Sequence, residues 1–170
     1  MTKLDLGCGT RKKEGFIGVD VQQFPGVDVV GNLGNDPWPW AADSVDEVHC
    51  SHMVEHLTWK ERIFFFNELH RVMKKGAKAA IIIPHWSCSK FYGDPTHKEP
   101  ISEFAFYYLN AAWRKDQAPH TDGMYTCDFD HTTGYSMHPA LNTRNQEYQF
   151  YALSWFKEAA QESMTTLTKR

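Results

Sequence analysis

Short apolar runs bounded by glycine or acidic residues dominate the first half of the chain. Residues 3–8 and 16–21 indicate two short strands, and further strands are expected at 26–32 and 44–50. Residues 78–84 contain an Ala-Ala-Ile-Ile-Ile run, typical of a strand that is buried on both faces of a parallel sheet. The pattern therefore predicts an α/β fold with a mostly parallel sheet.

Only residues 10–15 separate the first two predicted strands. A parallel crossover normally needs about a dozen residues and is usually helical. We therefore expect the first crossover helix to be shortened to roughly one turn or replaced by a loop.

Helical spacing becomes clear after residue 57. Thr58 and Glu61 have the spacing of a capping box, and apolar residues then recur at helical intervals. Lys74 and Lys75 followed by Gly76 match the preferences of a helix C-terminus, so this helix is expected to end there.

The second half alternates irregular and helical segments. A loop is expected over 85–100 and an aromatic helix over 102–115. Residues 116–139 look irregular, with a short strand near 125–129. Thr143 and Gln146 have capping spacing, and the apolar residues that follow predict one long helix to about residue 168.

Composition narrows the class of protein. The 170 residues fit one domain, and no apolar run approaches the length of a membrane span, so we expect no membrane partner and no signal peptide. A net charge of -3 and only short basic clusters disfavour nucleic acid and favour a small-molecule substrate. Four widely spaced cysteines without a Cys-x-x-Cys pair argue against a zinc ribbon and fit a reduced, cytoplasmic setting.

The segment Leu-Asp-Leu-Gly-Cys-Gly-Thr at 4–10 carries most of the chemical information. Gly7 and Gly9 permit a turn that other residues resist, and they allow main-chain N–H groups to approach a ligand closely. Asp20, at the end of the next strand, offers a carboxylate that can accept both hydroxyls of a ribose. Together these residues predict a nucleoside-cofactor site.

With these strands in place, the chain resembles the class I S-adenosylmethionine-dependent methyltransferases, particularly the small methyltransferase type 11-like members. Four segments match in order, at 4–10, 18–20, 44–57 and 68–76. The resemblance implies one domain with a Rossmann-like three-layer sandwich, a shortened first crossover helix and a helical C-terminal extension. Residues 3–84 would form the cofactor-binding half, and 85–170 the substrate-side loops and helices.

The resemblance also implies roles for individual residues. The residues expected at the S-adenosylmethionine site are Asp5, Gly7, Cys8, Gly9, Asp20, Val21, Asn32, Leu33, Ser51 and His52. Asp20 would bind the ribose, Asn32 and Leu33 the adenine, and the glycine turn the methionine portion. For Asp5 the alternative is a structural acid that binds the amides of the turn. Arg11 or Lys12 replaces a third glycine and is expected near the carboxylate of the cofactor.

Candidate catalytic residues follow the fourth and fifth strands, at the sheet edge where such folds bind ligands. His97 is hypothesised to be a general base with Asp94 beside it, because an imidazole titrates near neutral pH. The alternative for this loop is a turn in which Asp94 binds Thr96. His52 is expected at the opening between cofactor and substrate; its alternative is a packing role at a helix start.

No metal ion is expected from the spacing of potential ligands. Asp128, Asp130 and His131 could ligate a metal with His97 or His120, but no pair has the spacing of a dedicated site.

Three functions compete. The first is an S-adenosylmethionine-dependent methyltransferase that acts on a small-molecule or sugar-like acceptor and releases S-adenosylhomocysteine. Such an enzyme could be a homo-oligomer. The second is a noncatalytic S-adenosylmethionine-binding subunit that supports a partner protein, suggested by the short first crossover and by the lack of N-terminal helices over the substrate. A dinucleotide oxidoreductase is disfavoured, since the glycine turn lacks the third glycine of the pyrophosphate fingerprint.

Overall fold

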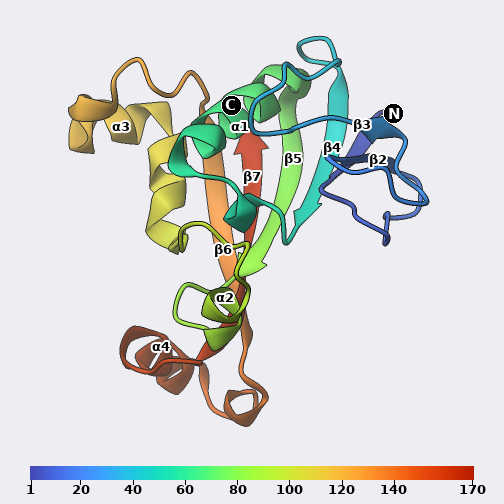
Figure 1. Ribbon diagram of the computed structural model, residues 1–170. Helices are drawn as coiled ribbons and strands as arrows, with labels where there is room; N and C mark the ends of the chain where they lie inside the picture. Colours follow the sequence, from blue (N-terminus) through green and yellow to red (C-terminus); the bar gives the residue numbers. More distant parts are fainter.

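A seven-stranded sheet organises the computed structural model, which describes residues 1–170 (Figure 1). The strands are β1 (Lys3–Leu6), β2 (Ile17–Asp20), β3 (Val29–Val30), β4 (Val45–Ser51), β5 (Met73–Pro84), β6 (Phe129–Met137) and β7 (Ala160–Lys169). Their order across the sheet is β3-β2-β1-β4-β5-β7-β6, and all neighbouring strands are parallel except that β7 runs antiparallel to both β5 and β6. The predicted α/β fold with a mostly parallel sheet is confirmed.

Four α-helices and four short 3₁₀ segments join the strands. They are α1 (Trp59–Val72), α2 (Ser89–Gly93), α3 (Ala111–Gln117), α4 (Gln146–Trp155), η1 (Val54–His56), η2 (Glu103–Leu109), η3 (Pro119–Thr121) and η4 (Pro139–Leu141). The Thr58 N–H donates to the Glu61 carboxylate at 2.7 Å, as the capping-box spacing predicts. No helix combines the length and the apolar character needed to cross a bilayer.

The first crossover contains no helix. The chain passes from β1 to β2 through a loop, as the short spacing predicts, and loops also connect β2 to β3 and β3 to β4. The buried carboxylate of Asp5 fixes the first of these loops by accepting the Lys13 N–H at 2.7 Å. Asp5 is thus a structural acid, but the amide that it binds belongs to the loop after the glycine turn and not to the turn itself.

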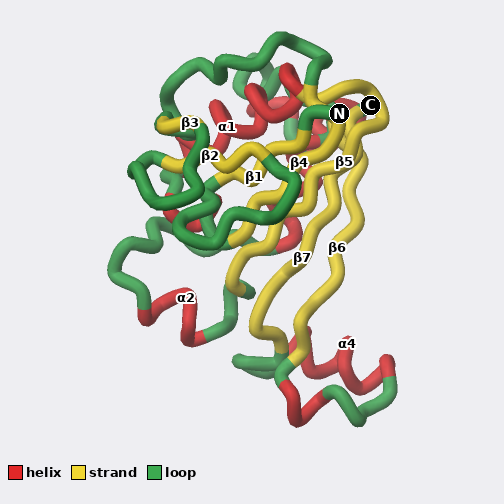
Figure 2. Tube along the Cα trace, turned by 90° about the vertical axis from the view of Figure 1, so that its right-hand side faces the viewer, coloured by secondary structure: helices red, strands yellow, loops and turns green.

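Only one face of the sheet is covered by helices. Along β5, Ala79, Ile81 and Ile83 are buried against the α1 face, whereas Ala80 and Ile82 on the other face are partly exposed. Figure 2 shows α1 on one side of the strands and no helix against the other side. The second helical layer of the expected three-layer sandwich is absent, and the expectation that this strand is buried on both faces was wrong.

The helix after residue 58 ends earlier than predicted, and β5 begins at once. α1 ends at Val72, and Met73 already has extended backbone. The Lys74 ammonium binds Asp46 at 2.7 Å, which ties this segment to β4. The lysines and Gly76 therefore belong to a strand, and their assignment to a helix C-terminus was wrong.

Three expectations for the second half also change. The helix predicted over 102–115 is two elements, η2 and α3, separated at Asn110, whose side chain caps α3 by accepting the Trp113 N–H at 3.0 Å. The strand expected near 125–129 is β6, which begins at Phe129.

The long C-terminal helix is the third of these corrections. Asn145, rather than Thr143, caps α4, and the helix ends at Trp155. Residues 160–169 form β7, in which Ser163, Thr165 and Leu167 alternate to the buried face. The predicted helical extension therefore consists of a short helix followed by a strand inserted into the sheet.

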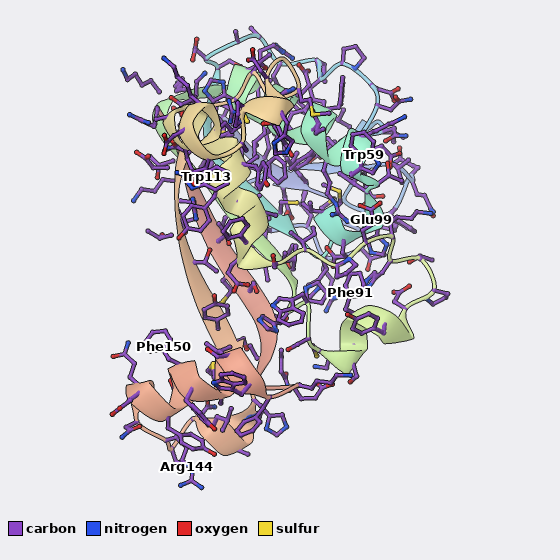
Figure 3. The ribbon with its side chains drawn as sticks, turned by 90° about the vertical axis from the view of Figure 1, so that its left-hand side faces the viewer. Trp59, Phe91, Glu99, Trp113, Arg144 and Phe150 are labelled. Atoms are coloured by element: carbon purple, nitrogen blue, oxygen red, sulfur yellow. The ribbon has the colours of Figure 1, made fainter.

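A small unit projects beyond the end of the sheet at which β5 finishes. It contains α4 and η4, which lie between β6 and β7 in the chain (Figure 1). Figure 3 shows Phe150 and Arg144 on this unit and Phe91 on the neighbouring α2. Large apolar side chains remain exposed here, with Phe150 at 56% and Trp155 at 73% of their full surface.

Candidate functional site

A cavity of about 640 Å³ opens at the carboxyl ends of β1, β2 and β4. Its lining residues are Gly7, Gly9, Asp20, Val21, Gln22, Phe24, Gly31, Asn32, Leu33, His52, Met53, His56, Leu57, Glu61 and Thr96. Ligands of open α/β sheets bind at this edge, at the point where the strand order reverses. That reversal falls between β1 and β4, beside the glycine turn.

The glycine turn closes one side of this cavity. The N–H groups of Gly7 and Cys8 both donate to the Val19 carbonyl, at 2.8 and 3.1 Å, which locks the turn onto β2. Gly7 and Gly9 have φ angles of +70° and +52°, a region that favours glycine. A Cβ atom on Gly7 would overlap the Met53 side chain. Both the backbone angle and the packing therefore require glycine at this position.

Asp20 lies beside this turn and faces the cavity. One carboxylate oxygen accepts the Gly9 N–H at 2.9 Å and the other accepts the Gln22 N–H at 3.0 Å. A carboxylate offers about four lone-pair positions, so two remain for further donors. Asp20 thus holds the turn in place and retains acceptor capacity toward a ligand.

Asn32 and Leu33 form the far wall, after β3. The Asn32 side chain accepts the Gly34 N–H at 3.1 Å, which shapes its own loop. The Leu33 carbonyl accepts the Trp38 indole N–H at 3.1 Å. Arg71 reinforces this loop by donating to the carbonyls of Trp38 and Trp40, at 3.0 and 2.8 Å.

The two cations near the first crossover are arranged differently from each other. The Lys12 ammonium pairs with Asp28 at 2.9 Å, and Asp28 also accepts the Gly18 N–H at 2.7 Å. Lys12 therefore ties the first crossover to the segment before β3, and neither it nor the exposed Arg11 lines the cavity.

His52 stands on the opposite side of the cavity, just after β4. Its backbone has a φ of +54°, and its two ring nitrogens lie 3.2 Å from Glu55 and 3.0 Å from Glu162. Glu55 is buried, with 1% of its surface exposed, whereas Glu162 comes from β7. The hydrogen bond to Glu55 is the main cause that raises the pKa of His52 above its ordinary value.

His97 and Asp94 do not line the cavity. The His97 ring is nearly buried and stacks against Phe91, and its Nδ1 lies 2.7 Å from the Phe91 carbonyl. Asp94 accepts the N–H and the hydroxyl of Thr96 at 2.8 and 2.6 Å, the loop-stabilising turn considered as an alternative. Thr96 and its neighbour His56 do reach the cavity wall.

The structure brings seven of the expected site residues to one cavity: Gly7, Gly9, Asp20, Val21, Asn32, Leu33 and His52. Asp5, Cys8 and Ser51 lie outside its lining. Sequence reasoning missed Glu55, His56 and Glu162. The adjacent Glu55 and His56 after the fourth strand could have signalled their involvement, whereas nothing in the sequence links Glu162 to His52.

Part of the first half of the chain matches a known family model. Residues 19–81 match the family model described as a methyltransferase domain. A search among curated proteins found no match.

Solved structures share the fold along the whole chain. A SAM-dependent methyltransferase from Archaeoglobus fulgidus is 20% identical, with a TM-score of 0.71 over 99% of this chain and 86% of that one. An S-adenosylmethionine-dependent methyltransferase from Mesorhizobium loti is 11% identical, with a TM-score of 0.61 over 99% and 90%. Geranyl diphosphate C-methyltransferase from Streptomyces coelicolor is 14% identical, with a TM-score of 0.56 over 99% and 71%.

These relatives are diverse. A putative methyltransferase from Haloferax volcanii, solved in complex with the Trm112 methyltransferase activator, is 12% identical with a TM-score of 0.57 over 99% of this chain and 82% of that one. The fold implied by the resemblance to class I S-adenosylmethionine-dependent methyltransferases is thus confirmed along the whole chain, and residues 19–81 match the methyltransferase-domain model.

Proposed function

We propose that the protein is an S-adenosylmethionine-dependent methyltransferase that acts on a small-molecule or sugar-like acceptor. The observation that carries this proposal is the cavity in which Asp20 binds the glycine turn and also lines the cavity wall. Its volume of about 640 Å³ is within the usual range for small-molecule sites.

The lining residues define two ends of the cavity, one for the cofactor and one for the acceptor. Asp20 would accept the ribose hydroxyls, and Asn32 with Leu33 would flank the adenine. With the nucleoside held in this way, the acceptor would enter from the side of His52, His56 and Thr96. Methyl transfer needs in-line attack by the acceptor, and much of its rate can come from positioning the two reactants.

His52 is the predicted catalytic residue with the strongest support on the acceptor side, because it lines the cavity while His97 and Asp94 do not. Its contacts with Glu55 and Glu162 fix the orientation of the ring. We assign it a role in binding and orienting the acceptor.

Calorimetry with S-adenosylhomocysteine and its 2′-deoxy analogue tests the cofactor assignment. A hydrogen bond to a charged group contributes about 1.5 to 3 kcal/mol, so wild type should prefer the hydroxylated ligand by roughly 10- to 150-fold. In Asp20→Asn this preference should fall severalfold or more, because the amide cannot accept both hydroxyls as a carboxylate does. The exposed Asp116→Asn is the matched control and should behave like wild type.

Two results would contradict the proposal. One is absence of S-adenosylhomocysteine binding by the folded wild-type protein. The other is an undiminished preference for the hydroxylated ligand in Asp20→Asn, which would limit Asp20 to holding the turn.

A noncatalytic subunit is the second candidate, favoured by the uncovered face of the sheet. On that face, Met164 of β7 is 41% exposed and Ile82 of β5 is partly exposed, so a partner protein could cover it. The Haloferax volcanii neighbour, a putative methyltransferase solved in complex with an activator protein, is an example of a chain of this fold that binds a partner. An acceptor screen that measures S-adenosylhomocysteine release separates the two candidates, since turnover by the isolated chain excludes the second.

A further inference from the structure

Three potential metal ligands converge beside the cavity. Glu55 and His56 come from η1, and His97 comes from the loop after α2. One ligand atom from each residue lies within 4.8 Å of the other two. This is the only group of three or more such residues in the structure, and it excludes Asp128, Asp130 and His131.

The buried carboxylate of Glu55 lacks a partner on one side. Its Oε1 lies 3.2 Å from His52, but its Oε2 is buried without any hydrogen-bond partner. Only 1% of the Glu55 surface is exposed, so water does not replace that partner from outside. Leaving a buried polar group unsatisfied costs about 1 to 3 kcal/mol, and more when the group is charged. A cation at this position would remove the cost.

Hydrogen bonds to the surrounding loop select one tautomer for each histidine. His97 Nδ1 lies 2.7 Å from the Phe91 carbonyl, which only accepts, so Nδ1 carries the proton. The Thr96 hydroxyl donates to Asp94 at 2.6 Å and therefore accepts from His56 Nδ1 at 3.0 Å. In the neutral rings, both Nε2 atoms are left with a free lone pair. Metal-binding histidines are held in this way, with the second ring nitrogen donating to a carbonyl or another acceptor.

We propose that Glu55, His56 and His97 form a binding site for a divalent transition-metal cation. Two imidazoles and one carboxylate suit Zn²⁺, Mn²⁺ or Fe²⁺, and three protein ligands leave a coordination position open. Bonds of about 2.1 Å hold ligand atoms roughly 3 to 3.5 Å apart, so binding requires about 1 Å of side-chain movement. The site replaces the expectation, based on ligand spacing in the sequence, that no metal is bound.

The open position bears on the proposed function. His56 and Thr96 line the cavity, so the cation would lie at the acceptor end. This part of the inference rests on the methyltransferase assignment. An acceptor oxygen could then complete the coordination, which selects hydroxyl-bearing acceptors and lowers the pKa of the coordinated hydroxyl.

The test is metal binding by the full-length protein after treatment with a chelator. Co²⁺ is titrated while its visible absorption is recorded, and Zn²⁺ and Mn²⁺ binding is measured by calorimetry, all without cofactor. We expect one equivalent to bind, with a Co²⁺ spectrum of low coordination number. His97→Ala and Glu55→Gln should each weaken metal binding by at least about 100-fold. Removing a residue that only supports a metal ligand already weakens binding by up to about 100-fold, and removing a ligand itself should weaken it at least as much.

His120→Ala is the matched control, because His120 is exposed and lies outside the group. Circular dichroism of each variant confirms folding, and His56→Ala replaces any variant that fails to fold. Absence of stoichiometric binding, or equal affinity in wild type and the folded ligand variants, would overturn the site. Failure to bind S-adenosylhomocysteine would instead contradict the proposed function and leave the metal result standing.

Discussion

Replacing Gly7 with alanine tests the reasoning about the glycine turn most directly. Gly7 has a φ of +70°, and an L-residue in the left-handed region costs about 1 to 2 kcal/mol. The added Cβ would also overlap Met53, and inserting a methyl group into a packed site typically costs about 1 to 3 kcal/mol. Gly7→Ala should therefore lower the free energy of unfolding by about 2 to 5 kcal/mol.

Gly9 provides the matched control within the same turn. Its φ is +52°, but a Cβ there would meet no atom within 4 Å. Gly9→Ala should therefore cost only the backbone contribution of about 1 to 2 kcal/mol. The difference between the two variants, about 1 to 3 kcal/mol, isolates the contact with Met53.

Urea denaturation followed by circular dichroism measures both variants. The midpoint should shift further for Gly7→Ala than for Gly9→Ala, with an unchanged slope. In a Met53→Gly background the cost of Gly7→Ala should fall to that of Gly9→Ala, because the overlapping side chain is gone. Equal destabilisation by the two alanines, or no change in the Met53→Gly background, would refute the steric argument.

Two further predictions concern buried titratable groups. Burial lowers the pKa of His85 in the folded protein, so the unfolded chain binds a proton more readily than the folded one. The stability that neutral His85 contributes is therefore present above about pH 6.5, the ordinary pKa of histidine, and is lost as the pH falls below that value. His85→Gln should flatten the decline of the unfolding free energy below pH 6.5 by up to about 1 kcal/mol per pH unit, and an unchanged slope would contradict this cause. All four cysteines are buried, and burial raises the pKa of Cys127 to about 12. A thiol reagent at pH 8 should therefore modify all four only after denaturation, and rapid labelling of Cys127 in the folded protein would show the burial argument to be wrong.

The first half of the fold could be predicted because local signals and tertiary structure agree there. The Thr58 capping box joins residues three positions apart, and Asp20 binds Gly9 of the glycine turn across only 11 positions of the chain. At residues 74–76 the local sequence preference and the tertiary structure conflict. The chain continues as β5 instead of a helix end, because Met73 pairs with Val45 of β4, and the exposed contact of Lys74 with Asp46 only adds to this pairing.

The C-terminal strand was missed because a helical apolar pattern was extended too far. Thr165, Thr166 and Thr168 are β-branched and flank Leu167, a composition that favours strands. The alternating burial of Ser163, Thr165 and Leu167 has the period of a strand. This signal was available in the sequence, whereas the pairing of β7 with β5 was not.

The candidate site also contains a part that could be predicted from the sequence and a part that could not. Asp20 was predicted from its place at the end of the strand after the glycine turn, and Asn32 from the family resemblance; both line the cavity. The contacts of His52 with Glu162, and of His56 with the loop before His97, join segments far apart in the chain. Such contacts depend on the path of the second half, which the sequence pattern did not predict correctly.

The position of β7 has a kinetic consequence. β7 separates β5 from β6, yet Ala79 of β5 pairs with Leu167 only after the whole of 85–159 has been traversed. Contacts between such distant segments slow folding, since the loop must close before the pairing is gained. Until β7 arrives, β5 is an open edge with the apolar run Ala79 to Ile83, the kind of edge through which chains associate. Refolding at high protein concentration should therefore be limited by intermolecular pairing along β5 rather than by the glycine turn or by α1.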